Sequence, residues 1–187
     1  MNIRHSIVKK CYTLFDKLGV KKLHIESDRI TVKRCKDIKN ATALRQEVVS
    51  DGRLDEAIDN IRIKKNKDEI NKIIRAQRIA EKAFDHILSF ISTEKTEKEI
   101  ALELDYFMLK NGAECISFDT IAVSGKNTSL PHGVPSDKKI ARGDFITMDF
   151  GVIYQGYCSD MTRTVAVGYA TEEMEKIYNT VLEAQLA

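Results

Sequence analysis

Near its end the chain alternates between apolar and polar side chains, and this alternation predicts a β-hairpin. Residues 146–154 and 157–167 are rich in β-branched and aromatic residues, the composition that strands favour. A Gln-Gly dipeptide at 155–156 separates them, and its glycine can adopt the positive φ of a tight two-residue turn. If Tyr154 pairs with Tyr157, the pairing of every other residue follows, because side chains alternate along a strand with a period of two.

That register places two aspartates on the same face of the predicted hairpin. Asp149 lies opposite Thr162, and Asp160 lies opposite Gly151, so the two carboxylates are diagonal neighbours. Diagonal pairs lie roughly 7–8 Å apart, which allows two side chains to reach metal ions roughly 3.5–4 Å apart in a two-metal hydrolytic site. One face is therefore suited to chemistry, and the opposite face, which carries Phe150, is suited to packing.

The pattern alone leaves a plain alternative open. Most carboxylates face water, and Asp149 and Asp160 would then be ordinary surface residues. His132, between Pro131 and Gly133, is on general grounds a solvated or hydrogen-bonded loop residue. The remaining histidines are expected to be structural or surface residues: His5, His24 and His86.

Five short motifs, in a fixed order, bear on this choice. Along the chain they are FDTIAVSG (118–125), LPHG (130–133), RGD (142–144), DFG (149–151) and GYCSDMTRT (156–164). In order and spacing they closely resemble the pita-bread metallopeptidases, and within these the Xaa-Pro aminopeptidase and prolidase branch rather than methionine aminopeptidase. The resemblance extends from about Ile63 to the last residue and is weaker before it.

The resemblance implies roles for individual residues. The aspartates that match Asp149 and Asp160 bind a pair of divalent metal ions in the family, usually manganese or cobalt and sometimes zinc. The histidine that matches His132 contacts the substrate and assists proton movement at the peptide bond. Thr162, opposite Asp149, is expected to donate a hydrogen bond to that carboxylate. The cofactors implied are two divalent ions, with manganese favoured.

Two of the five metal ligands of the family are present. The others, a histidine and two glutamates, belong to the second half of the fold, and no histidine follows Asp160. Two carboxylates and one imidazole cannot fill two metal coordination spheres, so this chain alone should bind hard divalent ions weakly. We therefore expect a chain truncated after the first half of the catalytic domain, with little or no peptidase activity by itself.

The expected fold class is α+β, a partial pita-bread fold with a reduced amino-terminal α/β segment. Residues 64–187 are expected to be the first half of the catalytic domain, in the order helix, helix, strand, hairpin, helix. Residues 1–63 are expected to be a reduced creatinase-like domain, which begins with a helix closed by Gly19 and a strand at Val20–Ile25. Residues 26–63 are polar and weakly periodic, and an internal deletion would explain this.

Caps and apolar spacing predict three helices in the larger domain. Asn66 with Glu69, and Thr96 with Glu99, form capping boxes, and Thr171 caps the last helix. The residues predicted to face inward are Ile70, Ile73, Ile74, Gln77, Ala80, Phe84, Ile87, Leu88 and Ile91 in the first helix, Ile100, Leu104, Phe107 and Met108 in the second, and Met174, Ile177, Tyr178, Val181 and Leu182 in the third.

Composition argues against several classes of partner. The chain has 30 basic and 28 acidic residues and a net charge of +2, which gives no electrostatic case for nucleic acid. No apolar run approaches the roughly 20 residues of a membrane-spanning helix. The four cysteines form no CxxC pair, and the first residues are amphipathic rather than a signal region. A cytoplasmic protein is expected.

The function that the resemblance implies is hydrolysis of the peptide bond before proline, with water activated by two metal ions and a proline-containing peptide as substrate. Half of such a fold would leave a sheet edge and apolar surface unpaired, so self-association or a second chain that supplies the missing half is expected. Two alternatives remain open. In the first, the chain is a non-catalytic pita-bread module that binds peptides or proteins. In the second, it is an inactive gene remnant.

Overall fold

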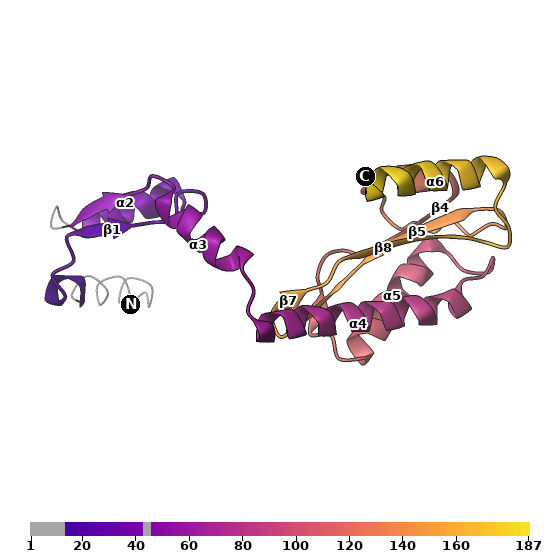
Figure 1. Cartoon of the computed structure of the whole chain (residues 1–187), viewed down its shortest axis with the longest axis horizontal. Helices are drawn as coiled ribbons and strands as arrows, with labels where there is room; N and C mark the ends of the chain where they lie inside the picture. Colours follow the sequence, from indigo (N-terminus) through magenta and orange to yellow (C-terminus); the bar gives the residue numbers. More distant parts are fainter. Residues whose placement is uncertain (1–13, 43–45) are drawn as a thin grey trace. The chain divides into compact units, whose positions relative to one another are not determined.

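We describe the protein from a computed structural model, in which residues 14–42 and 46–187 are described. The predicted first helix lies largely outside these residues. By its internal contacts the chain divides into two compact units, Met1–Lys65 and Asn66–Ala187. Each unit is described by itself (Figure 1).

The amino-terminal unit is built on two parallel strands, β1 (Lys22–His24) and β2 (Glu47–Val49). Helix α2 (Val32–Ala41) makes the crossover that a parallel pair requires, and Thr31 caps it by accepting a hydrogen bond from the Arg34 N–H. Helix α3 (Arg53–Ile63) follows β2.

This unit holds more regular structure than its weak periodicity predicts. Among the described residues, the end of the first helix and the strand at Val20–Ile25 were expected. Residues 14–17 are helical and β1 confirms the strand, whereas α2, β2 and α3 were not anticipated. Their short length explains the error. A three-residue strand shows no alternation, and neither helix has a fully buried residue that would mark a core stripe.

Two long helices open the second unit, as predicted. Helix α4 (Lys67–Phe90) begins at the capping box of Asn66 and Glu69, and α5 (Glu97–Lys110) begins at that of Thr96. Asn111 caps the end of α5. Ile100, Leu104 and Met108 are fully buried, as their spacing indicates, and Phe107 packs against the same core.

The buried face of α4 differs in part from the prediction. Ile70, Ile74 and Leu88 were expected inside, but each remains 46–50% exposed. Ala80 and Ile87 are buried as predicted, and Ala76, Ile79 and Ala83 are buried in addition. Because alanines have little volume beyond Cβ, they allow the sheet to approach the helix closely, and the contact stripe runs through them.

Two three-stranded antiparallel sheets follow. One has the order β4 (Ile121–Ser124), β5 (Phe145–Phe150) and β8 (Met161–Ala166). The other has the order β3 (Cys115–Ile116), β6 (Val152–Tyr154) and β7 (Tyr157–Cys158). The predicted hairpin thus passes from one sheet to the other, with the short helix η1 (Gly125–Ser129) and a long loop between β4 and β5.

The predicted register of the hairpin is confirmed. Tyr154 pairs with Tyr157 and Asp149 pairs with Thr162. At the turn, Gln155 and Gly156 have φ of 48° and 78°, the two positive values that a type I′ turn requires.

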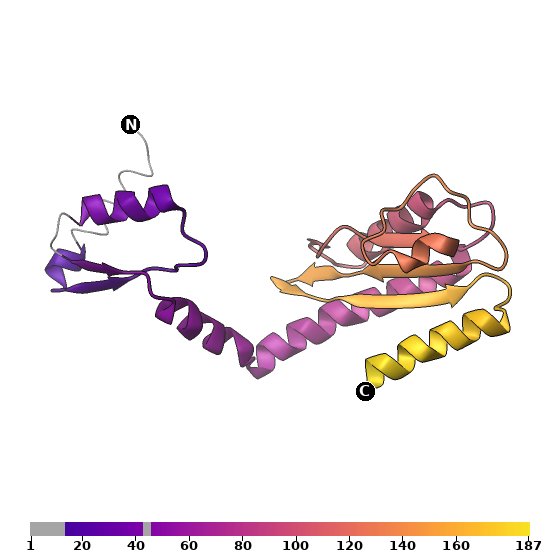
Figure 2. The same cartoon turned by 90° about the horizontal axis from the view of Figure 1, so that it is seen from above.

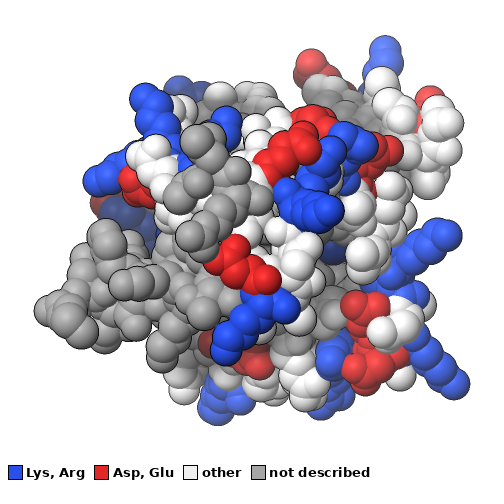
Figure 3. Space-filling model, turned by 90° about the vertical axis from the view of Figure 1, so that its left-hand side faces the viewer, with Lys and Arg blue, Asp and Glu red and all other residues white. Residues whose placement is uncertain are grey.

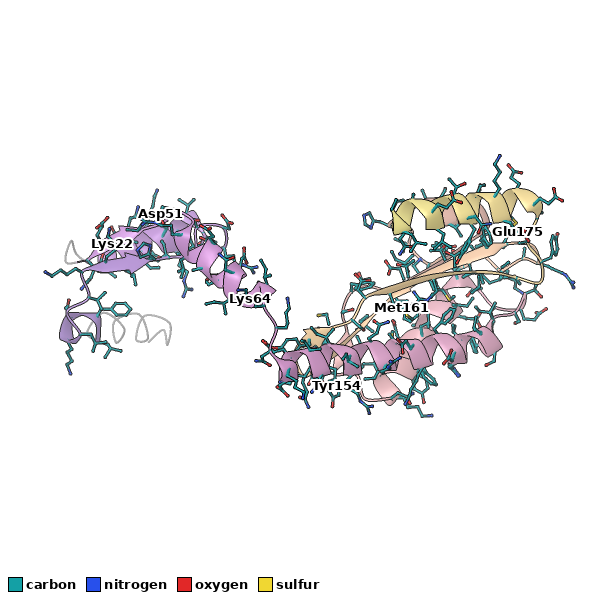
Figure 4. The ribbon with its side chains drawn as sticks, in the orientation of Figure 1. Lys22, Asp51, Lys64, Tyr154, Met161 and Glu175 are labelled. Carbon is teal, nitrogen blue, oxygen red and sulfur yellow. The ribbon has the colours of Figure 1, made fainter. Side chains whose placement is uncertain are left out.

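One face of the hairpin packs against the helices. Ile146, Met148, Phe150 and Val152 are fully buried, and Met161, which Figure 4 labels, accepts a hydrogen bond at its Sδ from Gln77 of α4 at 3.3 Å. Figures 1 and 2 show α4 and α5 on this side of the sheet and α6 on the other. Along β5, the buried residues Ile146, Met148 and Phe150 therefore alternate with the half-buried Phe145, Thr147 and Asp149.

The last helix, α6 (Glu172–Leu186), begins at its predicted cap Thr171. Its apolar stripe, however, is not buried as expected. Ile177 is 56% exposed and Val181 is 63% exposed; Tyr178 and Leu182 are exposed as well, and Met174 is half-buried. The ring of Tyr178 lies 6.3 Å from that of Phe145. Helical spacing identifies an apolar face, but it does not identify what covers that face.

Charges of both signs are mixed on the surface that Figure 3 displays, where Lys and Arg stand beside Asp and Glu. Among the described residues, no helix combines the length and the apolar composition needed to cross a membrane.

Candidate metal centre

The two predicted ligands lie where the hairpin passes between its sheets. Asp149 is on β5, half-buried, and Asp160 lies between β7 and β8 and is exposed. The prediction of two continuous strands is wrong at this point, because both strands break, one at Gly151 and the other at Ser159 and Asp160. Asp160 therefore precedes β8 and is not part of a regular strand pair.

Thr162 holds Asp149 in place. Its Oγ1 donates a hydrogen bond to Asp149 Oδ1 at 2.9 Å, the contact that the register predicts. Two residues along the same face, the hydroxyls of Thr147 and Thr164 hydrogen-bond each other at 2.9 Å. The polar face of the hairpin is thus organised by hydroxyl groups, and one of them orients a carboxylate.

His132 is exposed on the loop that follows η1. The loop turns tightly beside it, where the Gly133 N–H donates to the Leu130 carbonyl at 3.1 Å. A Cβ at Gly133 would lie 2.9 Å from a methyl carbon of the buried Val123. Only glycine lets the loop rest on β4 this closely.

Glu97 of α5 holds the same loop at Ser136, four residues after His132. The sequence analysis did not single out Glu97. Its side chain is fully buried. One carboxylate oxygen accepts from the Ser124 N–H and hydroxyl at 2.7 and 2.8 Å, and the other accepts from the Ser136 N–H and hydroxyl at 3.1 and 2.6 Å. Burial raises the pKa of Glu97, but the hydrogen bonds from Ser136 and Ser124 together outweigh it, so the pKa lies below its ordinary value.

A sequence signal for Glu97 did exist. It stands three and seven residues before Ile100 and Leu104, on the buried face of α5. A carboxylate on such a face is buried only when it is fully hydrogen-bonded, so its spacing, rather than its place in the first helical turn, was the informative feature.

A hollow of about 500 Å³ brings His132, Asp149 and Asp160 together. Residues 118–121 and 133–135 complete its lining. Thr162 is not part of the lining and contacts the hollow only through Asp149. Three of the four predicted site residues therefore share one concave surface.

Two further polar residues of the hollow were not predicted as site residues. Asp119 and Thr120 come from the first motif, which had served only to identify the resemblance. Thr120 Oγ1 donates to Asp105 Oδ1 at 2.5 Å. Burial raises the pKa of Asp105, against this hydrogen bond, and the nearby charge of Asp119 adds to the rise.

The donors present fit part of a metal site. Carboxylates suit hard divalent ions such as manganese, and Asp149 and Asp160 face one hollow. Within residues 14–42 and 46–187, no three His, Cys, Asp or Glu side chains are grouped so that they could hold a metal ion. The two aspartates therefore fit as two ligands of a larger set.

Comparison with known families gives one match that covers most of the chain. The model for metallopeptidase family M24 matches residues 71–187. These residues include the hollow, the hairpin and α6.

Individual relatives agree with that match. The uncharacterized peptidase YqhT of Bacillus subtilis is 39% identical over 183 residues, which are 96% of this chain and 50% of that protein. The Xaa-Pro dipeptidase of Pyrococcus furiosus is 47% identical over 133 residues, 71% of this chain and 38% of that protein.

A solved structure shows the same fold. The Xaa-Pro dipeptidase from Bacillus anthracis superimposes with a TM-score of 0.87 at 43% identity, over 96% of this chain and 49% of that one. The fold is therefore that of the pita-bread prolidases, and the chain spans about half the length of the relatives it matches.

Proposed function

Because the chain belongs to metallopeptidase family M24, we propose that it forms part of a metal-dependent peptidase that hydrolyses the peptide bond before proline. The observation that carries this proposal is the shared hollow of His132, Asp149 and Asp160. The names of the relatives, Xaa-Pro dipeptidases, support the substrate class. Both dipeptides and longer proline-containing peptides fit the proposal.

The predicted site residues would divide the work of the site between them. Asp149 and Asp160 would hold two divalent ions, with manganese favoured by the oxygen donors and cobalt or zinc as alternatives. Thr162 would keep Asp149 in the orientation that binding requires. Divalent ions bound there supply Lewis-acid activation of water and of the peptide carbonyl near neutral pH.

His132 would act on the substrate rather than on the ions. It is exposed on the lining of the hollow, so its imidazole can reach a bound peptide. It would donate a hydrogen bond to the carbonyl oxygen as negative charge develops there, or pass a proton to the departing nitrogen. Imidazole suits the second task because one ring nitrogen can accept a proton while the other donates one.

The described residues supply too few ligands for tight binding by this chain alone. Two carboxylates would leave most coordination positions to water. We expect millimolar rather than micromolar affinity for manganese and little or no peptidase activity without further ligands.

The exposed apolar face of α6 supports a further part of the proposal. Ile177 and Val181, one helical turn apart on the same face, are each more than half exposed, and Tyr178 and Leu182 beside them are exposed as well. A cluster of exposed apolar side chains of this kind is unusual for a surface that faces water. Another polypeptide, either a second copy or a chain that completes the fold, would cover them. Analytical ultracentrifugation of the chain at rising concentration distinguishes a self-associating chain from a monomer. The cytoplasm is the proposed location.

Peptidase activity tests the function directly. The chain is assayed on a Xaa-Pro dipeptide with manganese, alone and mixed with a separately made second half of a related family member. We expect activity only in the mixture, and its loss in Asp160→Asn but not in the surface variant Asp137→Asn. Activity of the chain alone would contradict the ligand count. Peptide binding without cleavage in the mixture would favour the non-catalytic module, and neither binding nor cleavage would favour an inactive remnant.

A further inference from the structure

The break in the hairpin keeps the same register on both sides. Phe150 pairs with Met161 before it, and Ile153 pairs with Cys158 after it. Each strand therefore has the same number of residues across the break, so this is not a β-bulge, in which one strand gains a residue. Both strands are distorted at the same level, and Asp160 lies within the distortion.

A side chain replaces a backbone group at this point. The Ser159 N–H donates to the Val152 carbonyl at 2.8 Å, as in a regular antiparallel pair. The reciprocal bond would run from the Val152 N–H to the Ser159 carbonyl. Instead, the Val152 N–H donates to Ser159 Oγ at 3.1 Å. The hydroxyl takes over the acceptor role, and the Ser159 carbonyl is released from the ladder.

The released carbonyl has its own partner outside the hairpin. Ser117, just after β3, donates its hydroxyl to the Ser159 carbonyl at 3.0 Å, and its N–H donates to the Gly151 carbonyl at 3.0 Å. Ser117 thus binds both distorted strands. Because Ser159 is only 4% exposed, these hydrogen bonds are shielded from water, and losing one leaves a buried polar group without its partner.

Gly151 makes this arrangement possible. A Cβ there would lie 2.1 Å from the Ser159 carbonyl oxygen and 2.5 Å from Ser117 Oγ. No side chain larger than hydrogen fits between them. The glycine stands two residues after Asp149, and Ser159 directly precedes Asp160, so the distortion lies between the two carboxylates that share the hollow.

We propose that Ser159 is a positioning residue that, with Ser117 and Gly151, holds the backbone of Asp160 out of regular strand pairing and so sets its carboxylate relative to Asp149 for joint metal binding. The metal part of this inference rests on the proposed function. The backbone part rests only on the hydrogen bonds of Ser159 and on the space that Gly151 leaves.

Manganese titration of the full chain tests the proposal, with free Mn²⁺ measured by electron paramagnetic resonance. Ser159→Ala removes the acceptor of the Val152 N–H, so the Ser159 carbonyl can return to the ladder and carry Asp160 with it. We expect at least about a 10-fold loss of affinity, the effect typical of removing a group that orients a metal ligand. Ser159→Thr keeps the hydroxyl and should recover affinity. Ser117→Ala, a milder change, should show an intermediate loss, and it provides the test if Ser159→Thr does not fold.

A matched control separates positioning from general destabilisation. Thr164→Val removes a hydroxyl from the same face of the same hairpin, but that hydroxyl bonds Thr147 rather than the break, and affinity should stay unchanged. Equal losses in Thr164→Val and Ser159→Ala would overturn the proposal. So would Ser159→Ala with wild-type affinity.

Backbone amide chemical shifts give a reading that does not depend on metal. In Ser159→Ala the amides of Val152 and Asp160 should shift, whereas Thr164→Val should leave them in place. If the wild-type chain binds no manganese, the proposed metal role of this chain is wrong, and the amide shifts still decide whether Ser159 holds Asp160. Unchanged shifts would overturn the positioning role.

Discussion

At the scale of single residues, hydroxyl groups organise the candidate site. Thr162 orients Asp149, Ser159 and Ser117 hold the strand break beside Asp160, and Ser136 ties the histidine loop to Glu97. A hydroxyl can both donate and accept, so it can bind a carboxylate or replace a backbone group. Conservative replacement of such residues is therefore the sharpest probe of the site.

Replacement of Thr162 by valine tests the orientation of Asp149. The change removes the hydroxyl at nearly constant volume from an exposed position, so stability should hardly change. Manganese affinity should fall about 10-fold, because the carboxylate loses the group that fixes its rotamer. Calorimetric or paramagnetic titration measures the loss, and a variant with wild-type affinity would show that Asp149 needs no such support.

Replacement of Glu97 by glutamine tests the buried carboxylate through the pH dependence of stability. The pKa of Glu97 in the folded state lies below its ordinary value of 4.5. Ionisation of Glu97 therefore stabilises the fold above about pH 4.5, and this contribution is lost as the pH falls through the folded-state pKa. At pH 7 the free energy of unfolding of the Glu97→Gln variant should be about 2 kcal/mol lower than that of the wild type, as is typical of hydrogen bonds to a charged group.

Urea unfolding at pH 7 and again below pH 4 measures this difference. The difference in free energy of unfolding between wild type and Glu97→Gln should become smaller in acid, where the wild-type carboxylate becomes protonated. If this difference in free energy stays constant over the whole pH range, the shape of the Glu97 side chain, not its charge, accounts for its role.

At the scale of elements, caps were predicted better than faces. Every predicted cap of the second unit is present, because a cap depends on residues three positions apart. The buried faces of α4 and α6 were predicted in part, because burial depends on which element lies opposite. Ile87 and Ile177 have the same kind of helical spacing, yet the first is fully buried and the second is 56% exposed.

The Thr96 cap provides the prediction at this scale. Its Oγ1 accepts from the Glu99 N–H at 3.2 Å, and Glu99 in turn accepts from the Thr96 N–H at 2.8 Å. Thr96→Ala should lower the free energy of unfolding by about 1 kcal/mol. Thr93→Ala, at an exposed turn position three residues earlier, is the matched control and should change it by less than about 0.5 kcal/mol. Equal effects would show that the cap contributes nothing specific.

At the scale of the whole molecule, the chain consists of two compact units that meet at residues 65 and 66. Residues 64–68 are exposed and carry three lysines at 64, 65 and 67. Exposed connections of this kind are preferred sites of proteolysis. The core of the second unit, from Ala76 to Met161, is contributed by that unit alone.

Limited digestion with trypsin should therefore cut first at these lysines and release a folded fragment that begins near Asn66. The fragment should unfold cooperatively and retain its circular dichroism. Replacement of the three lysines by glutamine should delay the cut. A fragment that is digested as soon as it forms would contradict the independence of the second unit.

The sequence by itself determined the features that depend on neighbouring residues. The hairpin register followed from alternation and one turn, and the caps followed from fixed spacings. The same register put both aspartates on one face of the hairpin, and both line the hollow. The tertiary structure alone decided the break at Gly151 and Ser159, the burial of Glu97 and the exposure of α6. The physical reason is that the break and the burial of Glu97 depend on partners far along the chain, while the exposure of α6 depends on what lies opposite its apolar face. Ser117 is 42 residues from Ser159 and Ser136 is 39 residues from Glu97, and no local period records such contacts.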